Sequence, residues 1–176
     1  TSLNTGQVAM MRGRYADQIH TNPVFATQYI AFDLEKAPFD NADVRRAFYY
    51  AINRDELTST VLKDIAIPAH SILPPGFPGY SENVAKQAVF DPAKAKELMA
   101  KAGYPDGKGF PDIEIWFREE GGYNGAILSP MAQYLQAQFK DILGITMNIK
   151  MMPGKDWMEG MLARKNNIYL SPYEYD

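Results

Sequence analysis

The sequence contains no cysteine, which excludes disulfide bonds, thiolate nucleophiles and zinc sites with cysteine ligands. Its only two histidines, His20 and His70, are too far apart for the HExxH pattern of zinc proteases. No GxSxG turn is present, which disfavours the serine hydrolases built on that motif. No hydrophobic run is long enough to span a bilayer.

Charge of either sign is not in excess. The 18 Lys and Arg residues against 21 Asp and Glu residues give a net charge of −3, so the sequence offers no basic field for nucleic acid. With 46% hydrophobic and 22% charged residues, the 176 residues have the composition of a soluble globular protein. We expect a single domain over residues 1–176. The start at Thr1 and the aromatic end at Asp176 predict a piece of a longer protein.

Hydrophobic periodicity predicts alternating strands and helices after residue 24, and residues 1–24 receive no firm element. The clearest helix has an apolar stripe over residues 44–52, with Asn41 as its N-cap. Asp91 and Gly103 are the expected cap and stop of a later helix. Strands are expected over 27–34, 113–118, 145–151 and 168–171, and helices over 44–52, 57–62, 92–102, 130–143 and 157–162.

These elements predict a mixed α/β (α+β) fold, with helices packed on a mixed sheet. Residues 112–151 read as a strand–helix–strand unit, most simply a right-handed crossover between parallel strands, with Pro130 opening the helix. The proline-rich segment 67–80 is expected to be a rigid loop, because proline fixes φ and lacks the amide donor.

Several segments have a structural and a functional interpretation. GYPDGKG at residues 103–109 lacks the spacing and the Ser or Thr of a phosphate-binding loop, so we interpret it as a turn. Glu119 and Glu120 are interpreted as part of a solvated loop, with a metal or ligand contact as the alternative. The methionines at 147, 151, 152, 158 and 161 are expected to be core residues. No catalytic residue, metal ligand or cofactor is predicted.

The aromatic end of the sequence is the strongest candidate for binding. Tyr173 and Tyr175 flank Glu174 and lead to Asp176, so this segment combines apolar area, hydroxyl groups and a negative charge for a ligand ammonium group. Its structural interpretation is a buried strand end.

Six segments, in this order, resemble signatures of the bacterial extracellular solute-binding proteins of family 5, which bind dipeptides, oligopeptides or nickel for ABC transporters. They are PFDNADVRRAF at 38–48, AINRD at 51–55, LPPGFPGY at 73–80, FDPAKAKEL at 90–98, AGYPDG at 102–107 and LGI at 143–145.

The resemblance covers roughly residues 24–176 and implies one lobe of a type II periplasmic-binding-protein-like fold, the C-terminal lobe called domain III. It implies a protein that is not an enzyme and that closes two lobes on a peptide. The implied partners are a peptide or other small solute, the permease subunits and the missing N-terminal lobe. The implied protein is a monomer, exported to the periplasm or cell exterior and associated with the membrane.

The resemblance also suggests the ligand contacts. PYEYD at 172–176 takes the place of a family segment in which an aspartate pairs with the peptide ammonium group, so Asp176 and Tyr173 are candidates, together with Tyr175. Tyr123 and Asn124, in the loop expected after the strand at 113–118, are further candidates. Pro172 and Tyr173 stand where Gly and Trp are usual in the family.

Because of these departures, a non-peptide ligand within the same family (a metal chelate, an oligosaccharide or an opine) stays open. A small hydrolase that uses Glu119 or Glu120 with Asp176 is an alternative of another class. A third is an interaction module that docks a partner on the loop 67–80.

Overall fold

Four strands form one mixed sheet in the computed structural model, which describes residues 5–20, 25–87, 89–119 and 122–174. Their order is β1-β4-β2-β3. Strand β2 is parallel to both β3 and β4, whereas β1 is antiparallel to β4. The mixed sheet predicted from the sequence is therefore confirmed. The strands are β1 (Ala26–Phe32), β2 (Ile113–Arg118), β3 (Met147–Met152) and β4 (Ile168–Glu174).

This pairing gives the sheet two distinct ends along the strand direction, each formed by the tips of all four strands. The carboxyl ends of β2, β3 and β4 and the start of β1 lie at one of them, which we call the carboxyl edge. The start of β2, β3 and β4 and the end of β1 form the opposite, amino edge.

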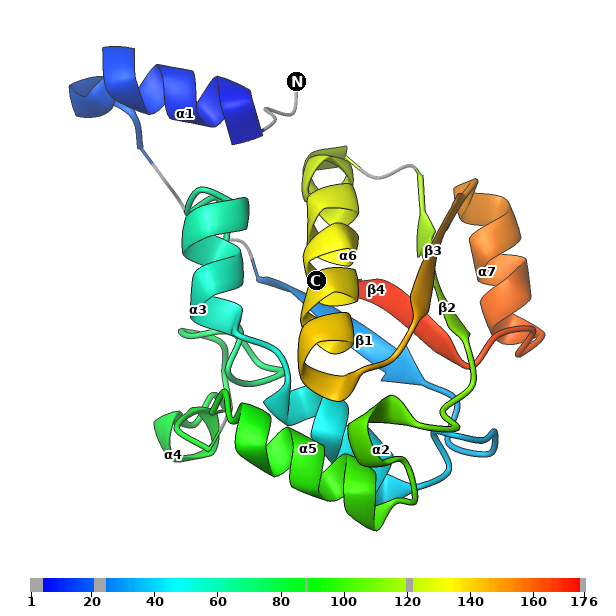
Figure 1. The fold of residues 1–176 in the computed structure, drawn as a ribbon. Coiled ribbons are helices and arrows are strands. Elements are labelled where there is room, and N and C mark those ends of the chain that lie inside the picture. Colours follow the sequence, from blue (N-terminus) through cyan, green and yellow to red (C-terminus); the bar gives the residue numbers. More distant parts are fainter. Residues whose placement is uncertain (1–4, 21–24, 88, 120–121, 175–176) are drawn as a thin grey trace.

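Helices cover both faces of the sheet (Figure 1). Helix α6 connects β2 to β3 as the predicted crossover, and α7 connects β3 to β4. Helix α1 lies away from the sheet and is joined to the rest by Arg12, whose guanidinium donates to the carbonyls of Lys63 and Asp64. The helical elements are α1 (Thr5–Arg14), η1 (Ala16–Gln18), α2 (Ala42–Tyr50), α3 (Arg54–Glu56), η2 (Leu57–Val61), α4 (Glu82–Ala85), α5 (Pro92–Lys101), η3 (Pro105–Gly107), α6 (Gly122–Leu143) and α7 (Gly154–Leu162).

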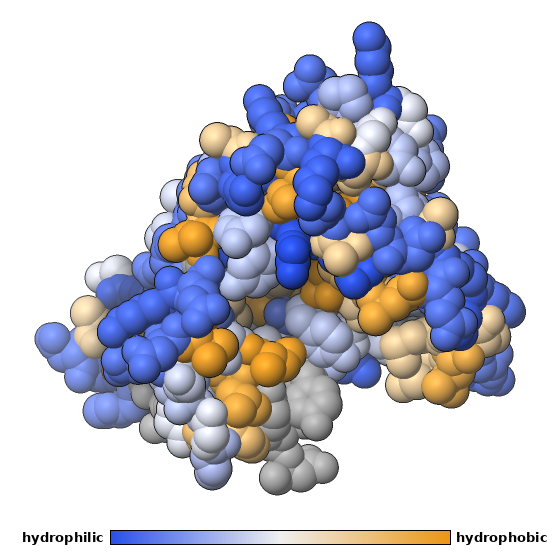
Figure 2. Space-filling model, turned by 90° about the horizontal axis from the view of Figure 1, so that it is seen from below, coloured by the Kyte–Doolittle hydropathy of each residue, from blue (hydrophilic) through white to orange (hydrophobic). Residues whose placement is uncertain are grey.

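The main core lies on the face of the sheet that α2, α5 and α6 cover. Phe48 of α2 packs against Phe39 and Phe139, with ring centroids 5.2 and 4.6 Å apart, and all three rings are buried. On the other face, Trp157 of α7 packs with Tyr169 and Met152 in a smaller cluster. Seen from below, the hydrophobic residues at the surface stand in small groups among hydrophilic ones (Figure 2).

Several predicted helix ends are confirmed. The Asn41 side chain accepts a hydrogen bond from the Asp43 amide at 2.8 Å, and that of Asp91 accepts one from the Lys94 amide at 2.9 Å. Gly103 and Gly144 follow α5 and α6 with positive φ, as helix stops require.

The start of α6 was predicted wrongly. The helix begins at Gly122 and contains Pro130, instead of beginning at Pro130. A proline inside a helix loses one hydrogen bond, but Ile127 and Leu128 are buried in the core and favour continuing the helix through it. Tyr123 and Asn124 therefore belong to the first turn of α6 and not to a loop.

Other expectations are corrected at the surface. Met147 and Met152 are buried, but Met151 and Met158 are 50% and 43% exposed, so they are not core residues. Strand β4 extends to Glu174 and includes Pro172. The register places Arg118, the last residue of β2, level with Ser171. Pro172 therefore lies beyond the end of β2. On the side of β4 that faces β2, no amide donor is needed at this position.

The amino edge contains an unusually close contact between two backbone segments. A Cβ atom added to Gly107 would lie 2.3 Å from the Gly144 carbonyl oxygen, and one added to Gly144 would lie 2.3 Å from the Asp106 carbonyl oxygen. Both glycines have positive φ. The turn after α5 and the end of α6 thus meet in a contact that only glycine permits.

Replacing either glycine of this contact should destabilise the chain strongly. We expect Gly107→Ala or Gly144→Ala to lower the free energy of unfolding by about 2–4 kcal/mol, because the Cβ adds both a steric clash and a left-handed backbone penalty. Gly109→Ala is the matched control, since Gly109 also has positive φ but no atom within 4 Å of its Cβ position. Its loss should be about 1–2 kcal/mol. Urea unfolding measures the free energy of unfolding of all three variants. Equal losses in the three would contradict a stabilising contact between Gly107 and Gly144.

Candidate functional site

The carboxyl edge gathers segments that are distant in the sequence. Strands β2 and β4 are adjacent and parallel, so the chain leaving β2, which forms the first turn of α6, and the end of β4 come to the same edge. Thr27 at the start of β1 lies opposite Tyr173 of β4. In open α/β sheets, ligands bind outside the carboxyl ends of parallel strands, which makes this edge the candidate binding site.

The proline-rich segment is fixed to this edge and closes one side of it. The Thr27 hydroxyl donates to the Ile72 carbonyl at 2.9 Å, and the Phe25 and Phe77 rings pack edge to face at 5.5 Å. Between the segment and β1 lies a cavity of about 110 Å³, whose lining includes His70, Ser71 and Tyr80. The segment is therefore part of the wall of the edge.

An arginine stands at the end of β2. The Nε atom of Arg118 is shielded from solvent and has no hydrogen-bond partner. Both amide atoms of the Gln28 side chain, near the start of β1, are likewise buried and unpartnered. Buried polar atoms without partners are rare in folded proteins. One more among the described residues, the Oε1 atom of Gln138, lies in the second half of α6, so such atoms are not confined to this edge.

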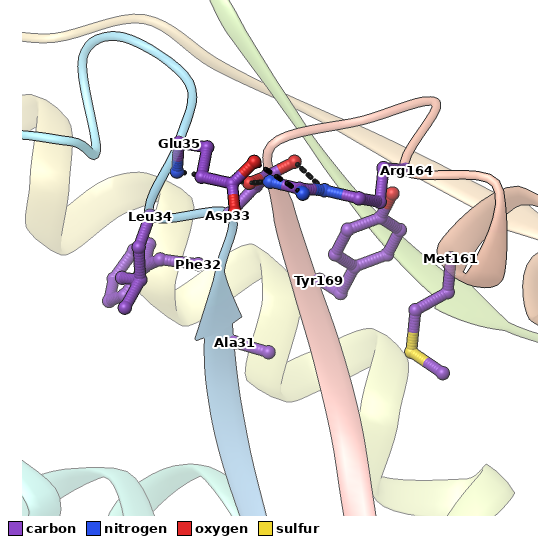
Figure 3. A pocket seen from close by; sticks show the side chains of 8 residues that line it. All are labelled: Ala31, Phe32, Asp33, Leu34, Glu35, Met161, Arg164 and Tyr169. Atoms are coloured by element: carbon purple, nitrogen blue, oxygen red, sulfur yellow. Dashed lines mark hydrogen bonds and ion pairs between the residues drawn. The ribbon is translucent and has the colours of Figure 1, made fainter.

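The larger cavity lies at the amino edge and has a different character. It measures about 380 Å³ and is lined by residues from the end of β1, the end of α7 and Tyr169. Figure 3 shows Asp33 and Glu35, after β1, facing Arg164, before β4. The Arg164 Nε donates to Asp33 at 3.0 Å, and its Nη1 donates to Glu35 at 2.7 Å.

Each charged side chain that lines this cavity therefore lies beside one of opposite sign. The Asp33 side chain is only 6% exposed, and the hydrogen bond from Arg164 holds the pKa of that carboxyl below its ordinary value. The same bonds raise the pKa of Arg164. Because these charges are already paired, we assign the cavity a structural role in joining β1 to the segment before β4.

The structure describes three of the five binding residues that the sequence suggested. Tyr173 is in β4 opposite Thr27, and Tyr123 and Asn124 are in the first turn of α6, so their backbones lie at the carboxyl edge. Tyr175 and Asp176 lie outside the described residues. Two residues of the hydrolase alternative, Glu120 and Asp176, also lie outside the described residues. The third, Glu119, is exposed.

Sequence reasoning missed Arg118, Thr27 and Gln28. Alternation along β2 places Arg118 on the same face as Trp116, yet nothing in the sequence indicates that its guanidinium lacks a partner. The described part of the chain contains no group of three or more His, Asp or Glu side chains placed to hold a metal ion. It also contains no helix long and apolar enough to cross a membrane.

Residues 1–175 match the sequence profile described as bacterial extracellular solute-binding proteins, family 5 Middle. Glutathione-binding protein GsiB of Salmonella choleraesuis (strain SC-B67) is 32% identical over 146 residues, which are 83% of this chain and 27% of that protein. Heme-binding protein A of Haemophilus influenzae is 36% identical over 104 residues, which are 59% of this chain and 19% of that protein. The chain thus spans well under half of these relatives.

Solved structures share the fold. A dipeptide binding protein from Pseudoalteromonas sp. SM9913, in complex with Met-Leu, has a TM-score of 0.79 and 27% identity, over 98% of this chain and 33% of that one. The murein tripeptide binding protein MppA of Escherichia coli has a TM-score of 0.81 and 20% identity, over 98% of this chain and 34% of that one. The predicted lobe of a periplasmic-binding-protein-like fold is confirmed.

The ion pair at the amino edge predicts an acid-dependent part of the stability. Because the pKa of Asp33 is lowered in the folded chain, the pair stabilises fully above about pH 5 and this stabilisation is lost as pH falls through the folded pKa. Asp33→Asn should therefore lower the free energy of unfolding at pH 7, and the difference from the parent should shrink toward pH 2. Urea unfolding across this range measures it.

Asp112→Asn, at an exposed position of the same edge, is the control and should change stability little at any pH. A difference between parent and Asp33→Asn that does not vary with pH would contradict the assignment.

Proposed function

Because this chain belongs to the bacterial extracellular solute-binding proteins of family 5, we propose that it is one lobe of the substrate-binding component of an ABC importer. In this proposal residues 1–176 form a single domain, and a second lobe of the same protein closes on it around the ligand. The protein delivers its ligand to permease subunits and catalyses no reaction. It acts as a monomer in the periplasm or at the cell exterior, close to the membrane.

The proposed ligand is a peptide, bound at the carboxyl edge. The observation that carries this is the parallel pairing of β2 and β4, which brings the first turn of α6 and the end of β4 to one edge of the lobe. The Met-Leu complex of the Pseudoalteromonas relative supports a short peptide as the ligand. No cofactor is part of the proposal.

Each candidate residue has a role in this site. Asp176 pairs with the α-ammonium group of the peptide, an interaction that strengthens when lobe closure excludes water. Tyr173 and Tyr175 supply apolar area and hydroxyl groups beside it. Tyr123 and Asn124, at the start of α6, contact the peptide from the neighbouring strand end.

A non-peptide ligand is the second candidate. Heme-binding protein A matches a shorter part of the chain at higher identity than GsiB does, and its name indicates a ligand that is not a peptide. Pro172 and Tyr173 also depart from the residues usual in peptide-binding members. Mass spectrometry of the ligand that copurifies with the full-length protein distinguishes the two.

Removing the charge of Asp176 tests the proposed site. In the full-length protein, Asp176→Asn should weaken binding of Met-Leu roughly 10- to 100-fold, because a hydrogen bond to a charged group contributes roughly 1.5–3 kcal/mol. Isothermal titration calorimetry measures the change. Asp141→Asn, exposed near the far end of α6, is the control and should bind like the parent. Unchanged affinity in Asp176→Asn would remove this residue from the site.

The isolated 176-residue chain should bind peptides weakly or not detectably. One lobe supplies half of the contacts and leaves its charges in water, where each interaction is worth less. Calorimetry of Met-Leu with the isolated chain and with the full-length protein makes the comparison. Equal, tight binding by both would contradict a site that two lobes share.

A further inference from the structure

The proline-rich segment beside β1 is held by individual contacts and not by a hydrophobic core. None of residues 67–80 is buried, and this stretch contains no helix or strand. Ile67 and Ile72 are 62% and 54% exposed, so burial of apolar side chains contributes little to its position. Its place at the carboxyl edge therefore depends on a small number of specific interactions.

Thr27 makes the hydrogen bond that fixes the middle of the segment. Its hydroxyl donates to the Ile72 carbonyl at 2.9 Å, and Thr27 is only 6% exposed although β1 is an edge strand. The Phe25 and Phe77 rings pack against each other beside it. One hydrogen bond of this kind shifts an equilibrium by only roughly 2- to 10-fold, so the contact is weak enough to open.

The segment is stiff within itself. Prolines fix φ at four of its positions, which are Pro68, Pro74, Pro75 and Pro78. The Phe77 amide also donates to the Pro74 carbonyl at 3.1 Å, which closes a turn inside the segment. A stiff segment moves as one body when its contacts with β1 open, and the bending is then confined to its ends.

Both ends of the segment have features that suit such a motion. Before it, Ala66 packs against the main core, and the Arg12 guanidinium donates to the Asp64 carbonyl at 2.8 Å, so this end is fixed. At the other end, Gly79 has a φ of 90° and is followed by α4. Glycine changes its backbone angles more easily than other residues, so the segment can turn at this point.

The segment lies where a ligand across the strand ends would extend. The sheet order places β1 next to β4, Thr27 lies opposite Tyr173, and the cavity of about 110 Å³ separates β1 from the segment. Neighbouring strands are about 4.8 Å apart, so the ends of β2, β4 and β1 span about 10 Å, the length of about three extended residues. A dipeptide fits within this span, whereas a tetrapeptide reaches past β1 and meets the segment.

We propose that residues 67–78 form a movable wall that limits the length of a bound ligand, and that Thr27 holds this wall closed. The inference rests on the proposed function and deepens it, because it assigns ligand length to one segment of the lobe. The closed wall favours a dipeptide, and the open wall makes room for a longer peptide. Thr27 is a positioning residue here, since it contacts the wall and not the ligand.

The motion of the wall is tested by thiol labelling in the full-length protein. The 176 residues contain no cysteine, and Ser71 lines the cavity behind the wall, so Ser71→Cys introduces a thiol that a maleimide reaches when the wall opens. Adding Thr27→Val should raise the labelling rate at this position roughly 2- to 10-fold, because valine keeps the shape of threonine without the donor. Mass spectrometry of the labelled peptide measures the rate.

The effect on ligand length is tested by calorimetry with Met-Leu and Met-Leu-Met-Leu, which share both terminal residues. Thr27→Val should shift the ratio of the two affinities roughly 2- to 10-fold toward the tetrapeptide, because the open wall is populated more often. Phe25→Ala should act in the same direction, since it removes the ring contact with Phe77. Thr27→Ser keeps the hydroxyl and should restore the parent's ratio and labelling rate.

Thr146→Val is the matched control, because Thr146 is exposed at the amino edge, and it should behave like the parent in both experiments. The thermal unfolding midpoint of each variant without peptide separates folding from wall motion. A lower midpoint in Thr27→Val with an unchanged labelling rate would assign Thr27 a role in stability alone and overturn the inference.

The remaining outcomes separate the two proposals. If the parent binds neither peptide, the proposed function fails and the assignment of ligand length falls with it, while the labelling rates still show whether the wall opens. If both peptides bind, but Thr27→Val keeps the parent's labelling rate and affinity ratio, the peptide function stands and the movable wall is wrong. Faster labelling with an unchanged ratio would overturn the control of ligand length.

Discussion

The structure depends on the parallel pairing of β2 with both of its neighbours. Parallel strands cannot be joined by a tight turn, so the chain must cross the sheet after β2 and again after β3. Right-handed crossovers that move in opposite directions along a sheet place their helices on opposite faces. The packing of α6 in the main core and of α7 in the smaller cluster follows from that rule.

The same pairing gives the two edges of the sheet different properties. At the amino edge, the chain enters the strands through tight backbone contacts and paired charges: Gly107 against Gly144, and Asp33 against Arg164. These interactions are satisfied within the lobe and stabilise it. At the carboxyl edge, Arg118 and Gln28 have buried polar atoms without partners. In the proposed function, ligand recognition therefore takes place at the end of the sheet opposite to these stabilising contacts.

Most of the fold was predictable because its signals are local. The apolar stripe of α2, the caps Asn41 and Asp91, and the alternation in β2 each depend on residues close in sequence. The start of α6 was missed because the burial of Ile127 and Leu128 outweighs the local stop signal of Pro130. The weak periodicity of residues 5–14 gave no sign of α1, which meets the described body of the lobe through Arg12.

The site was less predictable, since its properties arise from pairing between distant segments. The resemblance located Tyr173 and Tyr123 on two segments, but only the adjacency of β2 and β4 brings those segments to one edge. The contact of AGYPDG with LGI is similar: each motif reads as an isolated turn, and their common requirement for glycine appears only when Gly107 meets Gly144. Likewise, the lack of a hydrogen-bond partner for the Arg118 Nε atom depends on which segments surround it in the fold.

A binding edge with unsatisfied polar groups is consistent with a site that is completed by a second lobe. In water, an exposed carboxylate interacts weakly with a ligand charge, because the high dielectric constant reduces the interaction. In the proposed function, closure of a second lobe removes that water and strengthens the interaction. The ammonium pairing proposed for Asp176 would therefore couple ligand binding to closure, in addition to its contribution to affinity.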